Sequence, residues 1–255
     1  MGSSRLPGKV MLPLAGKPLL LQMYERVASA KSSGKIVIAI TEDQLDNELA
    51  TLCQKNGLNF YRGSSQDLLD RHFQAARKYN AGTVIKIPSD CPLIDPVIID
   101  KVILYYINNI DKYDFVSNLH PASYPDGNDV EIMKIETLEI AWLNAKKDFE
   151  REHTTPYIWE NPDRFRIGNV LWETGHDYSM TYRFTIDYKE DYDFIKRVYE
   201  ELYPNNPRFG LNDILSLLKY KPEIKKINEM YVGVNWYRNH LNELKTITSE
   251  QTRKI

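Results

Sequence analysis

The chain has 255 residues, and its 33 basic and 35 acidic side chains leave a formal net charge of −2. This near balance argues against a general nucleic-acid-binding protein, whose surface is normally strongly basic. The 42% of hydrophobic residues suffices for a large core, and two cysteines do not make a disulfide framework. No apolar run approaches the roughly 18 residues of a membrane span, so we expect a cytoplasmic protein without a membrane partner.

Apolar strands and amphipathic helices alternate through the first 110 residues. We expect strands at 35–41, 59–61 and 83–87, and helices at 18–30, 44–56 and 67–79, with another that begins at Asp95-Pro96. Asp43 is expected to cap the second helix and Gly57 to end it. The strand 35–41 is continuously apolar, which is typical of a strand covered on both faces. The alternation predicts an α/β fold with a doubly wound, mostly parallel sheet.

The pattern changes after Tyr113 and returns to a β–α order near residue 182. Strands at 114–118, 130–134 and 165–172 surround an expected helix at 136–147, which predicts a smaller α+β lobe over 114–172. A strand at 182–187 then rejoins the sheet, and helices follow at 190–203 and 212–219. We therefore expect one main domain over 1–228, which contains the smaller lobe, and a C-terminal extension over 229–255 whose role the sequence does not reveal.

The first nine residues, MGSSRLPGK, combine small residues with two cations and no acid. Backbone N–H groups can approach an oxyanion closely at the small residues, and the two cations can bind phosphate, Arg5 through its bidentate fork and Lys9 as a point charge. The small residues of this loop are Gly2, Ser3, Ser4 and Gly8. The residues themselves leave two alternatives open, a phosphate-binding loop and an ordinary basic loop.

Two aspartates directly follow expected strands. Asp90 comes after the strand 83–87, and Asp187 ends the strand 182–187 and precedes an acidic helix start. Open α/β sheets bind ligands at the carboxyl ends of their strands, and Mg²⁺ is commonly held by one or two carboxylates together with substrate phosphates. The alternatives are that Asp90 caps a turn and that Glu190 and Asp191 only complement the dipole of the helix they begin.

The loop GSSRLPGK with the following LPLAGKPLL resembles the nucleotide-binding loop of the cytidylyltransferases that make CMP-activated sugars. The similarity is greatest to the branch of the spore coat polysaccharide biosynthesis protein F, beside the CMP-acylneuraminate and CMP-Kdo synthetases. It extends from Gly2 to about Asn228 and implies a fold like that of the nucleotide-diphospho-sugar transferases. It also implies that the loop binds CTP and that Asp90 and Asp187 are ligands of Mg²⁺.

Three further stretches resemble segments of the same family. DLLDRH supplies Asp70 and Arg71, which border the nucleotide in this interpretation, or else pair with each other. DGNDVEIM and REHTTPYIW supply candidate contacts to the sugar. These candidates are Asp129, Glu131, Arg151 and His153. For the last two, a salt bridge between lobes with a capped helix end is an equally good interpretation.

The resemblance implies a Mg²⁺-dependent transfer of CMP from CTP to a sugar or sugar acid, with release of pyrophosphate, for surface polysaccharide biosynthesis. Two rivals remain. A glycosyltransferase of the related fold would need an Asp-x-Asp motif at a strand end, and the nearest candidate, Asp191-Tyr192-Asp193, lies in an expected helix. A degenerate sugar- or nucleotide-binding protein is the other. The family also suggests a homodimer through residues 117–172.

The resemblance raises one further expectation. In the family a buried strand that ends in Ala-Arg precedes the nucleotide-binding loop, whereas here the loop begins at Met1. Such a strand contributes ladder hydrogen bonds to two neighbours, and each large apolar side chain that it buries is worth about 1.5–3 kcal/mol. We therefore expect a sheet that lacks its first strand, in a chain truncated at its N-terminus.

Overall fold

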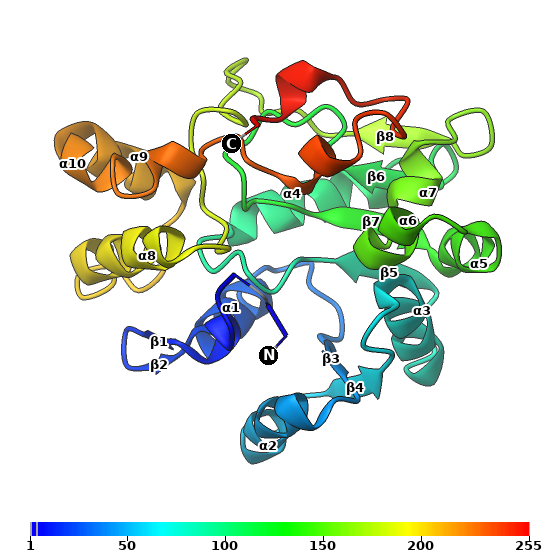
Figure 1. Ribbon diagram of the computed structural model, residues 1–255, viewed down its shortest axis with the longest axis horizontal. Helices are drawn as coiled ribbons and strands as arrows, with labels where there is room; N and C mark the ends of the chain where they lie inside the picture. The colour runs from blue at the N-terminus through cyan, green and yellow to red at the C-terminus, as the bar shows by residue number, and fades with distance from the viewer. Residues whose placement is uncertain (1, 4, 255) are drawn as a thin grey trace.

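The computed structural model describes residues 2–3 and 5–254, and its secondary structure alternates between strands and helices (Figure 1). The strands are β1 (Pro13–Leu14), β2 (Lys17–Pro18), β3 (Ile38–Thr41), β4 (Phe60–Gly63), β5 (Thr83–Lys86), β6 (Phe115–Ser117), β7 (Glu131–Lys134) and β8 (Ile167–Asn169). The helices are α1 (Leu19–Ala28), α2 (Asn47–Lys55), α3 (Leu68–Lys78), α4 (Pro96–Ile107), α5 (Ile135–Asn144), α6 (Asp148–His153), α7 (Pro156–Trp159), α8 (Lys189–Leu202), α9 (Leu211–Tyr220) and α10 (Pro222–Lys225).

The α/β class expected from the sequence is confirmed, and the sheets are mixed. β3 and β4 pair in parallel, while a four-stranded sheet has the order β5-β7-β6-β8. In that sheet β7 runs antiparallel to both neighbours, whereas β6 and β8 are parallel. The region expected to form a smaller lobe therefore supplies β6, β7 and β8 to the same sheet as β5, and its helical part is α5, α6 and α7.

The acidic cap expected at Asp95 is present, the one expected at Asp43 is not, and Asp67 caps a further helix. Asp95 accepts a hydrogen bond from the Val97 amide at 2.8 Å, with Pro96 in the first turn of α4. Asp67 accepts one from the Asp70 amide at 2.8 Å and begins α3. The expected cap by Asp43 was wrong, because a short 3₁₀ turn over 44–46 separates this residue from α2.

Two expected elements differ from the structure. Residues 182–187, expected as a strand, do not form one. Instead Arg183 makes an isolated β-bridge with Asp126, and the Ile186 amide donates a hydrogen bond to the Asp90 carbonyl at 2.9 Å. These contacts join the segment to the loops that contain Asp126 and Asp90 rather than to a strand. The helix expected at 136–147 is also interrupted, because Ala145 has an extended backbone between α5 and α6.

The pair β3–β4 is not hydrogen-bonded to the larger sheet in the described part of the chain, and it lies apart from that sheet below β5 in Figure 1. A cavity of about 1600 Å³ extends into the space between them, lined on one side by residues 36–41 and on the other by residues 83–87. Among the described residues, the edges of β3 and β5 that face this space have no strand partner.

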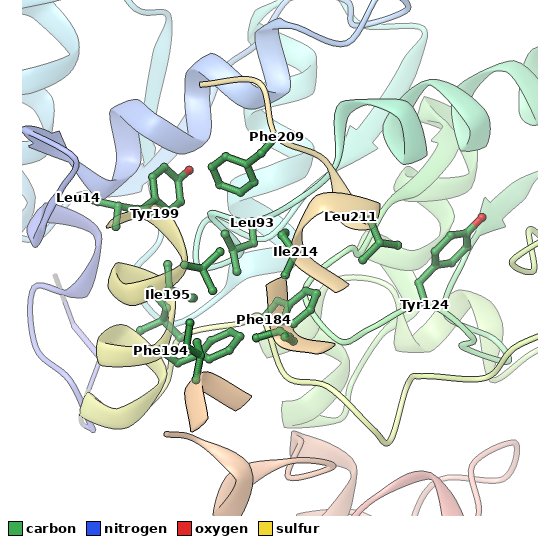
Figure 2. Close-up of a cluster of buried hydrophobic side chains, with 14 of the residues drawn as sticks. Leu14, Leu93, Tyr124, Phe184, Phe194, Ile195, Tyr199, Phe209, Leu211 and Ile214 are labelled. Atoms are coloured by element: carbon green, nitrogen blue, oxygen red, sulfur yellow. The ribbon is translucent and has the colours of Figure 1, made fainter. Parts of the chain in front are cut away.

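A buried apolar cluster fixes the segment that carries Asp187. Phe184 and Ile186 are fully buried and pack with Phe194 and Ile195 of α8. Figure 2 shows Phe184 beside Phe194, with Leu93 and Ile214 on the other side of the same cluster. Because the apolar side chains alternate with Arg183, Thr185 and Asp187, the polar side chains are directed away from this core.

The helices of the described chain are all too short or too polar to cross a membrane. After α10 the chain has only short 3₁₀ turns, and residues 229–254 run back across the top of the larger sheet in Figure 1. Glu160 of the α7 region holds part of this segment, because its carboxylate accepts hydrogen bonds from the amides of Lys245 and Thr246 at 2.6 and 2.9 Å. The C-terminal segment is thus built into the fold.

Candidate functional site

The N-terminal loop brings both of its cations to the two expected acids. Gly8 adopts φ 69°, a left-handed conformation that favours glycine, and turns the chain into a 3₁₀ turn over 9–11. The Lys9 ammonium lies 2.7 Å from Asp90 Oδ2 and 3.3 Å from Asp187 Oδ1, and it also donates to the Ile186 carbonyl. Arg5 contacts the same Asp187 oxygen at 2.7 Å while its side chain stays 46% exposed.

The structure shows contacts for only some of the small residues of the loop. The Ser3 hydroxyl accepts a hydrogen bond from the Leu6 amide at 3.3 Å, and Gly2 lines the cavity. Ser4 lies outside the described residues, so its expected contact with the nucleotide stays a prediction.

Lys9 and Asp187 are both charged at neutral pH. Burial opposes the charge on Lys9, yet Asp90 and Asp187 raise its pKa above the ordinary value. Burial likewise opposes the charge on Asp187, but Lys9, Arg183 and Arg5 hold the pKa of this carboxyl below its usual range. Opposite charges close to a carboxylate favour its charged form, so the site is a compact group of two acids and two cations.

Arg183 is a central residue that the sequence analysis missed. Its side chain is only 1% exposed, and its guanidinium contacts Asp187 at 2.8 Å, Asp191 at 2.9 Å and Asp126 at 3.4 Å. These acids raise its pKa in spite of its burial. The alternation of apolar and polar residues in YRFTID was the available signal, since it places Arg183 and Asp187 on the same face. Arg183 therefore orients the Asp187 carboxylate toward the loop.

Asp126 and Asp129 lie beside this group on the turn that leads to β7. Burial raises the pKa of Asp126, with the charge of Asp129 adding to the effect, and burial also raises the pKa of Asp129. Between them Gly127 has φ 98°, and a Cβ there would lie 2.7 Å from the Phe184 carbonyl carbon. The turn therefore requires glycine at this position.

The expected sugar contacts Glu131 and His153 both line the cavity. Glu131 is buried on β7, where its carboxylate pairs with Lys86 and accepts from the Thr155 hydroxyl. His153 stacks on Trp236 with ring centroids 3.9 Å apart, and burial lowers its pKa to about 3, so it is neutral at pH 7. Trp236 belongs to the C-terminal segment, to which the sequence assigned no role.

Two of the remaining candidates do not line the cavity, and one does. Arg151 donates to the Asp67 carboxylate at 2.8 Å and to the Trp142 carbonyl at 2.6 Å, which is the salt-bridge alternative. Asp70 accepts from the Trp142 indole at 2.8 Å and does not pair with Arg71. Arg71 lines the cavity, and its Nε is buried without a hydrogen-bond partner in the described chain.

His72, which follows Arg71 in the chain, predicts that the stability of the protein depends on pH. Burial, with Lys86 and Arg71 nearby, lowers the pKa of His72 to about 3, so between pH 6 and 4 the native state binds fewer protons here than the unfolded state. Its contribution is lost as the pH falls through this range, by about 1.4 kcal/mol per pH unit. Urea unfolding of His72→Gln should show a pH slope smaller by this amount, and equal slopes would contradict the assignment.

The carboxylates of the Asp-x-Asp motif that a glycosyltransferase would need do not form one site. Asp191 is fully buried, where it binds Arg183 and accepts from the amides of Asp187 and Tyr188. Asp193 lies on the outside of α8 and pairs with Lys189. The two carboxylates thus serve different neighbours and do not converge on one point.

Asp90 and Asp187 do converge, because both carboxylates contact the Lys9 ammonium. Hard oxygen ligands of this kind suit Mg²⁺, which typically completes its coordination with substrate phosphates and water. The described residues contain no group of three or more His, Cys, Asp or Glu that could hold a metal by themselves. The donor set therefore fits an ion that is shared with a bound phosphate.

An α/β fold in which a cationic, glycine-containing loop lies against the carboxylates of Asp90 and Asp187 is the arrangement expected of a nucleotidyltransferase. Comparison with known proteins agrees. The sequence model of the family described as cytidylyltransferase matches residues 1–212. The chain is 34% identical over 231 residues to an uncharacterised protein of Methanocaldococcus jannaschii. The aligned residues cover 89% of this chain and 90% of that protein.

Two further relatives are similar over most of their length. The spore coat polysaccharide biosynthesis protein SpsF of Bacillus subtilis is 31% identical over 228 residues, with 88% of this chain and 92% of that protein covered. A solved cytidylyltransferase of Leptospira borgpetersenii has a TM-score of 0.82 and 33% identity, with 88% of this chain and 92% of that chain covered. This chain belongs to the cytidylyltransferase family and is a nucleotidyltransferase.

Proposed function

We propose that the chain is a Mg²⁺-dependent cytidylyltransferase that transfers CMP from CTP to a sugar or sugar acid and releases pyrophosphate. The observation that carries this proposal is the convergence of Arg5 and Lys9 on Asp90 and Asp187 at one end of the cavity. The similarity to SpsF supports a role in surface polysaccharide biosynthesis. The homodimer through residues 117–172 remains a prediction.

In the proposed reaction an acceptor hydroxyl oxygen forms a bond to the α-phosphorus of CTP. The bond from that phosphorus to the oxygen bridging to the β-phosphate breaks, pyrophosphate leaves with the electron pair, and the hydroxyl proton is released. Arg5 and Lys9 would bind the triphosphate and offset its charge. Mg²⁺, held by Asp90 and Asp187, would neutralise the charge that develops on the phosphate oxygens. Arg183 holds Asp187 in position.

No covalent intermediate on the enzyme is required. Cys91 follows Asp90 but is fully buried, and burial raises the pKa of its thiol well above the ordinary value. Since the thiolate is the nucleophilic form, this cysteine is a packing residue. Catalysis would then come from positioning and from charge neutralisation.

Pyrophosphate release tests the function. The protein should release pyrophosphate from CTP, but not from ATP, GTP or UTP, when the correct sugar or sugar acid is supplied from a panel. Sugar transfer from a nucleotide sugar without pyrophosphate release would favour the glycosyltransferase rival. Nucleotide or sugar binding without any turnover would favour a degenerate binding protein.

Replacing Arg5 or Lys9 with alanine should weaken CTP binding more than sugar binding. Each change removes a hydrogen bond to a charged group, worth about 1.5–3 kcal/mol, or roughly tenfold to a hundredfold in Kd. Separate calorimetric titrations with CTP and with the acceptor measure the two effects. The matched control is Lys17→Ala, which removes a nearby exposed cation paired with Glu25. Unchanged CTP affinity in the Arg5 and Lys9 variants would leave only an ordinary basic loop.

A further inference from the structure

Arg238 lies in the C-terminal segment, beyond the residues 1–212 that the family model matches. It belongs to a 3₁₀ turn over 236–239, and its side chain lines the cavity. The Asn235 side chain accepts from the Tyr237 amide at 3.1 Å and caps this turn. Arg183 donates to the Val234 carbonyl at 2.6 Å, so the residue that orients Asp187 also anchors the chain just before Arg238.

The guanidinium of Arg238 is incompletely paired. Its Nη1 is buried and has no hydrogen-bond partner in the described chain, and its Nη2 has only a marginal contact with the Tyr188 hydroxyl at 3.5 Å. An unpaired buried donor is costly, and such groups in native proteins call for an explanation. Only one other arginine nitrogen in the described residues is buried without a partner, Arg71 Nε, and Arg71 lines the same cavity.

Tyr188 places Arg238 beside the phosphate loop. This tyrosine directly follows Asp187, and the Arg5 guanidinium lies over its ring at 5.3 Å from the centroid. The Tyr188 ring is itself held in place, because it stacks on Tyr231 with centroids 3.9 Å apart. Arg5 and Arg238 thus approach the same side chain from two segments of the chain that are more than 200 residues apart.

We propose that Arg238 is a further ligand of the CTP triphosphate, which it would bind together with Arg5. The proposal rests on the function proposed above. Arginine suits this role, because its planar fork donates two parallel hydrogen bonds to phosphate oxygens. Asp126, Asp187 and Asp191 already engage Arg183, and Glu131 engages Lys86. Arg238 is therefore a cation of the cavity that has no carboxylate partner in the described chain.

Calorimetric titration of Arg238→Gln with CTP tests the proposal. The Kd for CTP should rise by about tenfold to a hundredfold, while the Kd for cytidine, which has no phosphate, stays unchanged. Arg238→Lys should fall between these, since it keeps the charge but loses the fork. Arg253→Gln is the matched control, because it makes the same charge change at an exposed position of the same segment. It should bind CTP like the wild type.

Each outcome has one meaning. Equal CTP affinity in Arg238→Gln and the wild type would overturn the proposal and leave the proposed function intact. A raised KM for the acceptor with unchanged CTP affinity would also overturn it, and would assign Arg238 to an anionic group of the acceptor. Failure of the wild type to bind CTP would instead contradict the proposed function. Unfolding curves identify a variant that is only destabilised, and Arg238→Lys then provides the comparison.

Discussion

Asparagine in place of Asp90 or Asp187 should lower turnover by about a hundredfold or more and leave the fold intact. The amide keeps the shape of the carboxylate but loses the charge that would hold Mg²⁺, and an interaction of several kcal/mol in the transition state corresponds to this change in rate. Because Lys9 contacts both acids, each variant also leaves a more positive loop. Binding of CTP without metal should therefore be retained or become tighter while turnover is lost.

Steady-state pyrophosphate release and metal-free CTP titration measure the two halves of this prediction. Asp193→Asn is the matched control, since this acid lies on the surface of α8 and, among the described residues, pairs only with Lys189. It should leave both measurements unchanged. Near-normal, Mg²⁺-dependent turnover in either the Asp90 or the Asp187 variant would remove that residue from the metal site.

An apolar strand of about six residues fused ahead of Met1 should raise the free energy of unfolding by several kcal/mol. The reason is the space between β3 and β5, into which the cavity extends and where the facing strand edges have no strand partner among the described residues. Each large apolar side chain that fills such a space contributes about 1.5–3 kcal/mol. Ladder hydrogen bonds to both neighbours would add to this.

Urea unfolding compares the fusion with the 255-residue chain, and calorimetry compares their CTP affinities. The 255-residue chain should bind CTP more weakly than the fusion. A fused glycine-serine segment of equal length is the control, because it lengthens the chain without apolar side chains. If the 255-residue chain proves monodisperse, cooperatively folding and as active as the fusion, the expected position of the strand is wrong.

The sequence was most informative where local patterns decide the structure. A continuous apolar run predicted β3, and the Asp95-Pro96 pair predicted the start of α4, because cap chemistry acts within one turn. The position of Asp90 and Asp187 after apolar runs correctly suggested that they lie together. Their roles in binding metal remain predictions.

Contacts between distant segments could not be read from the sequence. The antiparallel course of β7 and the crosswise bonds of residues 182–187 depend on how separate elements meet. The ion pairs of Arg183 and the contact of Arg238 with Tyr188 also join segments far apart in the chain. The sequence left a sugar contact and a salt bridge equally open for Arg151, because a cation in this local pattern fits both, and in the structure Arg151 pairs with Asp67.

The position of bound nucleotide tests the central claim most directly. A crystal grown with CTP and Mn²⁺, measured at a wavelength that reveals manganese by its anomalous scattering, locates the metal and the phosphates independently of turnover. The account predicts one manganese peak between Asp90 and Asp187, with the triphosphate bound by Arg5 and Lys9. A manganese peak away from these two carboxylates, or a triphosphate bound elsewhere in the cavity, would contradict it.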